Sequence, residues 1–116
     1  MSTVVEAAEA LAAALRGVEG VRYVPDLAAV VEPPATALGP PALTWDAYCV
    51  EPTEARFIAY VVVARDERAL PRLWDLVPRV AAALDAVPDA VVRRADPGLY
   101  PSGELPCYQI QVEVSL

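Results

Sequence analysis

The sequence contains neither histidine nor lysine, and its nine arginines are outnumbered by sixteen acidic residues, which gives a net charge of −7. Histidine is the side chain most often used for general acid–base catalysis near neutral pH, and lysine is required for Schiff bases and phosphate-binding loops. Only carboxylates are left as catalytic candidates, and they fall at predicted turns. A hydrolase with a pair of carboxylates is the enzymatic alternative, but we expect a protein without catalytic residues.

Metal, cofactor and nucleic-acid sites also lack their usual residues. Cys49 and Cys107 are too few for a disulfide framework, and without histidine they do not complete a zinc site. The five glycines form no phosphate-cradling run. Arg93 and Arg94 are the only adjacent cations, and we interpret them as part of a solvated strand face, since nucleic-acid binding needs clustered cations. We therefore expect no metal, no cofactor and two free, buried thiols.

Long apolar runs and an N-terminal leader are missing as well. The longest uncharged stretch, residues 33–45, contains four prolines and is too short to cross a bilayer. Glu6 and Glu9 interrupt the position of a signal-peptide core, so we expect no membrane association and synthesis in the cytoplasm. The 116 residues allow one domain. Hydrophobic residues make up 56%, above the roughly 45–50% of typical soluble domains, which indicates apolar surface buried between subunits.

What is present is an apolar strand followed by an amphipathic helix. Residues 57–64 carry no polar alternation, which predicts a strand buried on both faces at the centre of a sheet. Residues 67–86 predict a helix, with Asp66 as its cap and a kink between Trp74 and Pro78, because proline removes one helical hydrogen bond. Its expected apolar stripe consists of Leu70, Leu73, Trp74, Val77, Ala81 and Leu84.

The N-terminal third predicts one helix and two short strands. Thr3 and Glu6 have the spacing of a capping box, so we expect a helix at about 3–16. Residues 21–24 alternate as a strand, and residues 27–31 fit one helical turn. Residues 35–38 lie between two proline pairs, which predicts an edge strand or an extended loop, because proline lacks an amide donor. A polyproline ligand is the alternative, although the intervening residues lack its pattern.

The rest of the chain predicts three more strands and one long loop. Residues 43–50 are rich in aromatics and are expected to pair with the central strand through an acidic turn at 51–54. Residues 90–95 predict a strand, and residues 96–106, dense in turn formers, predict either a contact loop or a mobile one. Residues 108–116 alternate strictly and predict a half-buried final strand.

These elements together predict an α/β (α+β) fold. We expect one domain over residues 1–116, with a mixed, mostly antiparallel sheet and two main helices packed against it.

The order of these elements resembles that of the tail terminator, or tail completion, proteins of long-tailed bacteriophages, in particular the minor tail proteins of phages that infect high-GC actinobacterial hosts. The likeness is carried by the proline pairs at 33–34 and 40–41, the strand and turn FIAYVVVARDE, the helix LWDLVPRVAAALDAV and the strand at 108–114. These segments cover most of the chain, and none of them is a catalytic motif.

The resemblance implies a structural virion protein that assembles into a six-membered ring. In such proteins the ring caps the tail tube, stops its polymerisation and joins it to the head-side connector, while DNA passes through the lumen without specific binding. It implies a place in the tail or neck of the virion after synthesis in the host cytoplasm. Two alternatives stay open: a head–tail connector or stopper of the same neck, or a small acidic immunity or regulatory protein.

Two sets of residues are candidates for these roles. DNA carries about one negative charge per 1.7 Å of axis, so an acidic lumen would let it pass; the candidate acids are Glu51, Glu54 and Glu104. Contacts with other subunits or the tube are expected in the long loop and at two unpaired strand edges, residues 35–38 and the final strand. The contact residues proposed are Leu99, Tyr100, Ala35 and Leu38.

Overall fold

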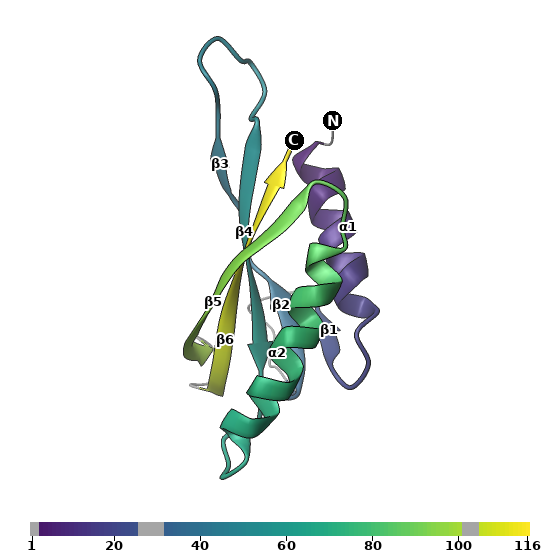
Figure 1. Ribbon diagram of the computed structural model, residues 1–116, viewed down its shortest axis with the longest axis vertical. Coiled ribbons are helices and arrows are strands. Elements are labelled where there is room, and N and C mark those ends of the chain that lie inside the picture. The colour runs from purple at the N-terminus through teal and green to yellow at the C-terminus, as the bar shows by residue number, and fades with distance from the viewer. Residues whose placement is uncertain (1–2, 26–31, 101–104) are drawn as a thin grey trace.

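A computed structural model describes residues 3–25, 32–100 and 105–116, and it confirms an α+β domain with two helices and a six-stranded mixed sheet (Figure 1). The helices are α1 (Val4–Arg16) and α2 (Ala69–Asp85). The strands are β1 (Arg22–Val24), β2 (Ala35–Leu38), β3 (Ala42–Thr44), β4 (Glu54–Val62), β5 (Ala90–Tyr100) and β6 (Leu105–Ser115). The helical turn predicted at 27–31 lies outside the described residues, as does Glu104.

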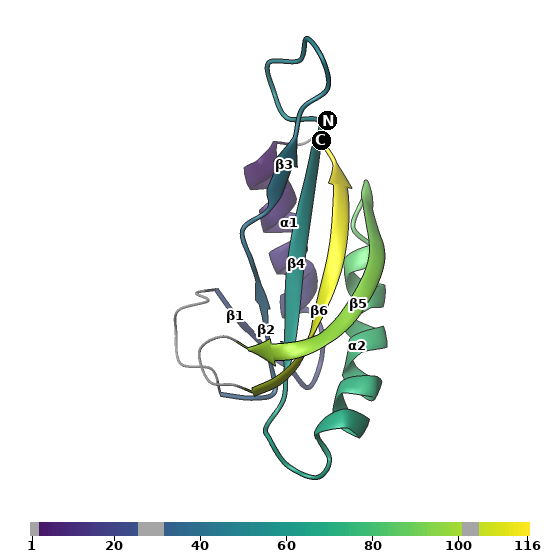
Figure 2. The ribbon, with the colours of Figure 1, turned by 90° about the vertical axis from the view of Figure 1, so that its left-hand side faces the viewer.

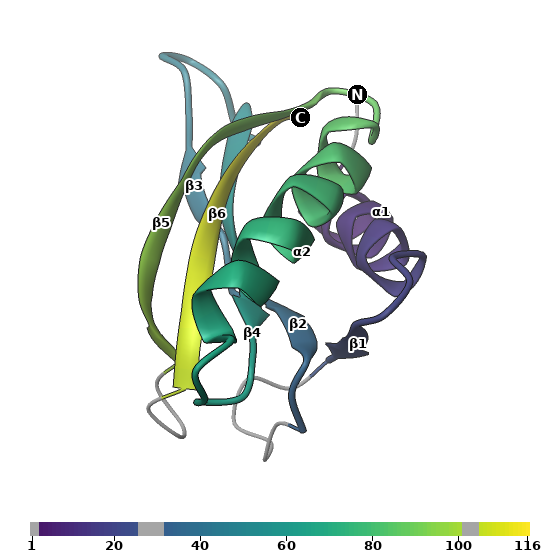
Figure 3. The ribbon, with the colours of Figure 1, turned by 60° about the horizontal axis from the view of Figure 1, so that its bottom comes forward.

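The sheet has the strand order β1-β2-β4-β6-β5, and β3 pairs separately with β4. β1 and β2 run parallel, and every other described pair is antiparallel. Both described helices lie on the same face of the sheet (Figure 3). β4 is the central strand, as predicted, because β2, β3 and β6 all pair with it.

The main core fills the space between the two helices and the sheet. On the sheet side, β4 and β6 contribute alternate residues, and their register places Phe57 opposite Val112 and Ala59 opposite Ile110. Burying an aliphatic or aromatic side chain contributes about 1.5–3 kcal/mol, so this layer dominates the stability of the domain. On the helix side the large core residues are Leu11, Leu15, Leu73, Leu76, Val80 and Leu84.

The other face of the sheet is only partly covered. Ile58 and Tyr60 of β4 are half-buried there, so the prediction that residues 57–64 are buried on both faces is wrong at these two positions, whereas Val62 on the same face is buried. A second, smaller core lies at one end of this face. Its rings are the half-buried Tyr60 and the buried Tyr100, which meet edge to face with their centroids 5.7 Å apart, and its remaining buried members are Ala37, Val62 and Cys107.

α1 begins as the sequence predicts. The Thr3 hydroxyl accepts a hydrogen bond from the Glu6 amide at 3.1 Å, and the Glu6 carboxylate accepts one from the Thr3 amide at 3.4 Å. This capping box satisfies two amides that the first helical turn leaves free.

α2 is rotated relative to the predicted stripe. Leu70 and Trp74 are 51% and 59% exposed, whereas Leu76 and Val80 take core positions. The helix has two overlapping apolar stripes, and the spacing of the residues alone does not show which of them is buried. The stripe that is buried consists of Ala69, Leu73, Leu76, Val80 and Leu84.

The start of α2 also differs from the prediction. The cap position is held by Arg68, and the Asp66 carboxylate instead accepts hydrogen bonds from the Arg68 amide at 2.8 Å and the Arg72 guanidinium at 2.7 Å. These two donors lower the pKa of Asp66. α2 continues through Pro78 as one helix, as expected, and the bend at Pro78 stays a prediction.

The two strands predicted to be edges lie inside the sheet. β2 is flanked by β1 and β4, and β6 is flanked by β4 and β5. Ala35 is 1% exposed and Leu38 is half-buried, so the expected free edge at 35–38 is wrong. The proline pairs flank β2 without interrupting it, and the strand therefore keeps the amides it needs for pairing on both sides.

The loop predicted at 96–106 is mostly strand. β5 extends to Tyr100 and β6 starts at Leu105, and Pro97 pairs with Tyr108. Tyr100 is 1% exposed, so its expected place on a contact loop is wrong, whereas Leu99 is 58% exposed. The final strand itself is confirmed, and it begins earlier than its alternation indicated.

The two thiols lie in different environments. Both are free, but only Cys107 is buried as predicted; Cys49 is exposed. Burial raises the pKa of the Cys107 thiol to about 11.

Candidate interaction surfaces

An arm formed by residues 42–53 protrudes beyond the body of the sheet (Figures 1 and 2). β3 pairs with the start of β4, with Ala42 opposite Arg56 and Thr44 opposite Glu54, which confirms the predicted antiparallel pairing. The turn predicted at 51–54 is wrong, because Glu54 already belongs to β4 and the connection spans residues 45–53. The strand predicted at 43–50 ends at Thr44, because β4 begins only at Glu54 and offers no partner further out. Residues 45–53 therefore leave the sheet as a connection without strand structure.

The arm carries apolar side chains that its own chain does not cover. Leu43 is 36% exposed, Trp45 50%, Val50 91% and Tyr48 106%. Scattered exposed apolar residues are ordinary, whereas a group of them on one protruding segment is typical of a protein contact. The aromatic pair fits this interpretation, since tryptophan and tyrosine are enriched at protein interfaces.

Hydrogen bonds within the arm fix its shape. The Trp45 indole donates to the Val50 carbonyl at 3.3 Å, and the Cys49 amide donates to the Asp46 carbonyl at 3.1 Å. Tyr48 has a φ of 68°, in the left-handed region that is unfavourable by about 1 kcal/mol for a residue other than glycine. The arm is thus a turn with a defined geometry that holds the Tyr48 side chain outward.

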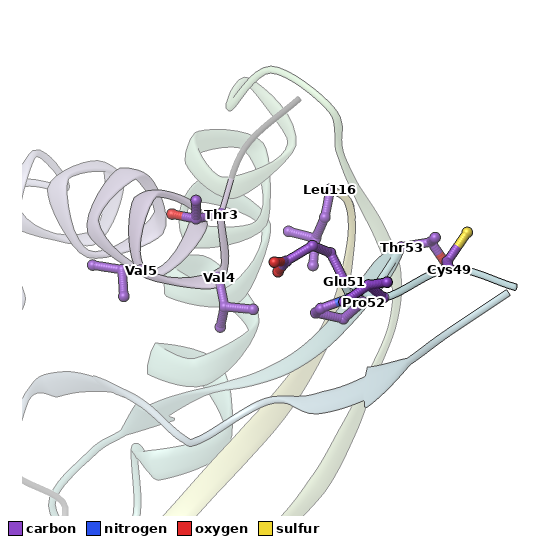
Figure 4. Close-up of a pocket in the computed structure, with 9 residues that line it drawn as sticks. Thr3, Val4, Val5, Cys49, Glu51, Pro52, Thr53 and Leu116 are labelled. Carbon is purple, nitrogen blue, oxygen red and sulfur yellow. The ribbon is translucent and has the colours of Figure 1, made fainter.

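A groove of about 670 Å³ lies at the base of the arm (Figure 4). Three separate segments form it: the start of α1, the returning half of the arm and the last residue of the sequence. The lining residues are Thr3, Val4, Val5, Cys49, Val50, Glu51, Pro52, Thr53 and Leu116.

The lining of the groove is suited to apolar groups. Its walls are mostly aliphatic, and the Thr3 hydroxyl is already engaged in the α1 cap. In the described part of the chain, no three side chains of the metal-binding types come together. The same residues include no helix that is long and apolar enough to span a membrane.

A second apolar surface lies at the other end of the molecule, near the start of α2, and we call it the Trp74 surface. It consists of Leu70, Trp74 and Leu99, which are 51%, 59% and 58% exposed. The Trp74 indole donates to the Tyr108 hydroxyl at 3.1 Å. Leu99 pairs with Pro106, which places it diagonally across from Tyr108 on the same sheet face. α2 and the end of β5 therefore contribute to one surface.

Charges differ between the two surfaces. Arg65 and Arg68 lie in the turn that leads to Leu70, and they form no ion pair with any described residue. The arm carries Asp46, which is exposed and equally without a described ion-pair partner, and it has no basic residue. The turn before Leu70 also carries two exposed acids, Asp66, which pairs with Arg72, and Glu67, which has no ion pair among the described residues. Arg65, Arg68 and Arg72 against Asp66 and Glu67 leave one net positive charge there, whereas the arm carries only acids, Asp46 and Glu51.

The adjacent pair Arg93 and Arg94 is neutralised locally. Arg93 contacts Glu113 at 2.8 Å and Arg94 contacts Asp96 at 2.7 Å. Asp96 also raises the pKa of Arg94. This geometry agrees with a solvated strand face and leaves no concentrated positive charge there.

The predicted lumen acids are only partly brought together. Glu51 is exposed at the groove, and Glu54 is half-buried with its carboxylate 3.6 Å from Arg56. Both lie at the base of the arm, so they share one end of the molecule, whereas Glu104 is outside the described residues. Of the predicted contact residues, Leu99 is the one that the structure places on an exposed surface.

Sequence reasoning missed both the arm and the position of Trp74. The aromatics of residues 43–50 favour a strand, and the spacing of Trp74 fits the predicted core stripe. No local signal marks the arm, because whether residues 45–50 find a strand partner depends on where β4 begins. No local signal marks the exposure of Trp74 either.

Comparisons with known proteins add no identification, since no protein family and no curated protein matches this sequence.

Proposed function

We propose that the protein is a ring-forming structural component of a bacteriophage tail, a tail terminator that caps the tail tube and joins it to the head-side connector. The observation that carries the proposal is the presence of two separate apolar surfaces, the arm and the Trp74 surface, at opposite ends of one small chain (Figure 1). Different surfaces that contact each other between copies make a heterologous interface, which builds a ring when the rotation between neighbouring subunits closes and an open filament when it does not. The number of subunits expected, six, comes from the resemblance of the sequence to tail terminators.

The charge balance supports the same proposal. With a net charge of −7, a ring of such subunits is acidic overall, and DNA would pass through its lumen without being held. Glu51 and Glu54 at the base of the arm are our candidates for the lumen wall. A cationic lumen would retain DNA by releasing its counterions, which is the opposite of what a passage requires.

A tube-capping assay tests the function. The protein is added to the tail tube protein of the same genome during polymerisation, and tube lengths and tube ends are imaged by electron microscopy. A terminator gives shorter tubes with a ring at one end. Rings that leave the tube unchanged but bind the head-side connector would indicate the connector or stopper alternative, and a protein that stays monomeric with both partners would indicate a regulatory one.

The lumen assignment has its own test. Reversing the charge of Glu51 and Glu54 to arginine is expected to leave rings and tails intact and to slow genome ejection, because the lumen then attracts DNA. Reversing Glu9 and Glu19, which are exposed acids on and after α1, is the matched control. Unaltered ejection in the first variant would place these carboxylates elsewhere on the ring.

A further inference from the structure

We propose that the arm of one subunit docks on the Trp74 surface of a second copy of this chain. The inference rests on the proposed ring and deepens it, because it names the two surfaces that form the subunit interface. The side chains of the arm that dock are Leu43, Trp45, Asp46, Tyr48 and Val50. The receiving surface is defined by Leu70, Trp74 and Leu99, bordered by Arg65 and Arg68.

The arm does not reach the receiving surface of its own chain. It protrudes from one end of the molecule, whereas the turn into α2 lies at the other end, as both side views show (Figures 1 and 2). The longest dimension of the domain is 51 Å. A contact between the two surfaces therefore requires a second copy.

The two surfaces match in chemistry. Each presents one exposed tryptophan together with aliphatic groups, so that docking removes apolar area from water on both sides. Aromatic residues are also the usual centres of binding energy at interfaces. The shape of the arm is fixed in advance by the hydrogen bond from Trp45 to the Val50 carbonyl, which reduces the entropy lost on docking.

Charge selects the pairing of unlike surfaces. Asp46 is exposed on the arm, and Arg65 and Arg68 are exposed beside Leu70, all three without ion pairs among the described residues. Arm against arm would place carboxylates together, and two receiving surfaces would bring together two turns that each have one net positive charge, from Arg65, Arg68 and Arg72 against Asp66 and Glu67. Like charges disfavour both symmetric arrangements, so the arm-to-Trp74 contact is the one that electrostatics favours.

A pair of variants separates the two halves of the contact. Trp45→Ser with Tyr48→Ser removes the arm anchors, and Leu70→Ser with Trp74→Ser removes the receiving anchors. All four side chains are exposed, so both variants are expected to fold, which circular dichroism and thermal unfolding verify. Val91→Ser, an exposed apolar residue on neither surface, is the matched control and should assemble as the wild type does.

Mixing the two variants gives the decisive readout. Each variant alone should have the mass of one subunit, because all its copies lack either the arm anchors or the receiving anchors. An equimolar mixture should form a heterodimer and nothing larger, since the intact arm of one variant fits the intact receiving surface of the other. A symmetric arm-to-arm interface predicts no heterodimer, and that result would overturn the proposal.

Charge reversal provides a second route that leaves the apolar anchors in place. Arg65→Glu with Arg68→Glu should weaken assembly at least tenfold, and adding Asp46→Arg to the same chain should restore most of the loss. Assembly that is insensitive to these reversals would contradict the pairing. The two proposals fail differently: rings that persist in all variants overturn this interface alone, whereas a wild-type chain that stays monomeric with and without tail tubes overturns the ring as well.

Discussion

Two segments of this chain each adopt the structure that the sequence predicts for the other. Residues 45–50 are aromatic and suggest a strand, yet they form an exposed connection; residues 96–100 contain proline and glycine and suggest a loop, yet they belong to β5. The tyrosines of the two segments differ in the same way: Tyr48 of the connection is 106% exposed, and Tyr100 of β5 is 1% exposed.

The difference lies in the partner each segment finds within its own chain. Residues 96–100 face β6 in antiparallel register, and pairing overrides their weak strand propensity. Gly98 contributes by having no side chain, because a Cβ there would come within 3.2 Å of the Gln109 amide nitrogen. Residues 45–50 extend past the start of β4 and find no partner. Apolar residues left in this way are available to another molecule.

Truncating the two tyrosines tests this contrast with the largest expected effect on folding. Tyr100→Ala removes a buried ring from the smaller core and should lower the free energy of unfolding by about 3 kcal/mol. Tyr48→Ala, the matched control on the arm, should change it by no more than about 0.5 kcal/mol. Chemical denaturation followed by circular dichroism measures both. Equal losses in the two variants would mean that the arm is part of the folded core.

The two cysteines test the same contrast through chemical reactivity. Cys49 on the arm is exposed, whereas Cys107 is buried and its pKa is raised to about 11, so little thiolate forms at the pH of an alkylation reaction. In the native protein at about pH 8, Cys49 should react roughly 100-fold faster than Cys107. Mass spectrometry of timed samples follows both sites.

The raised pKa of Cys107 also predicts a loss of stability at high pH. A group whose folded pKa is raised stabilises the fold below its unfolded pKa, here 9.0, and loses that contribution as pH rises to about 11. Cys107→Ala should remove this part of the pH dependence, and Cys49→Ala should not. Simultaneous alkylation of both thiols in the native protein would contradict the burial of Cys107.

Shortening the arm tests whether it contributes to the fold. Replacing residues 45–52 by an Asn-Gly turn should change the free energy of unfolding by less than about 1 kcal/mol, because closing a shorter connection between β3 and β4 alters the entropy little. Thermal unfolding of the shortened and wild-type chains provides the comparison. A shortened chain that does not fold would show that the arm stabilises the domain itself.

The smallest expected effect on stability concerns the turn into α2. Unlike the two segments above, this turn is stabilised by hydrogen bonds between its own residues and the first turn of the helix. Because the pKa of Asp66 is lowered in the folded protein, the Asp66 carboxylate stabilises the fold at pH values above its ordinary pKa of 3.8. This stabilisation is lost as the pH falls through the folded pKa. Asp66→Asn should therefore be slightly less stable than wild type near neutral pH, and the difference should vanish in acid. A difference that is the same at all pH values would exclude the carboxylate as its cause.

The sequence predicted those parts of the fold that depend on local pattern. The capping box of Thr3 and Glu6 placed α1, and the alternation from Tyr108 onward placed β6, because each signal depends on residues close in the chain. The central place of β4 followed from its continuous apolar run. The fold class followed from these three elements together.

The errors concern interactions between distant segments. Trp74 and Leu76 both fit a helical stripe, and only the position of α2 on the sheet decides which is buried. β2 became an interior strand because β1 pairs with it in parallel, a contact that flanking prolines do not reveal. The arm, which is central to the candidate site, escaped prediction for the same reason, since the missing partner of residues 45–50 is a property of the whole sheet.

The most direct test of this account compares the mass of the wild-type protein with that of the Trp45→Ser, Tyr48→Ser variant by light scattering coupled to size-exclusion chromatography. We expect the wild type, alone or seeded by tail tubes, to have about six times the subunit mass of 12.4 kDa. The variant should have the subunit mass and the same unfolding curve. A variant that assembles as well as the wild type would contradict the claim that the arm holds the ring together.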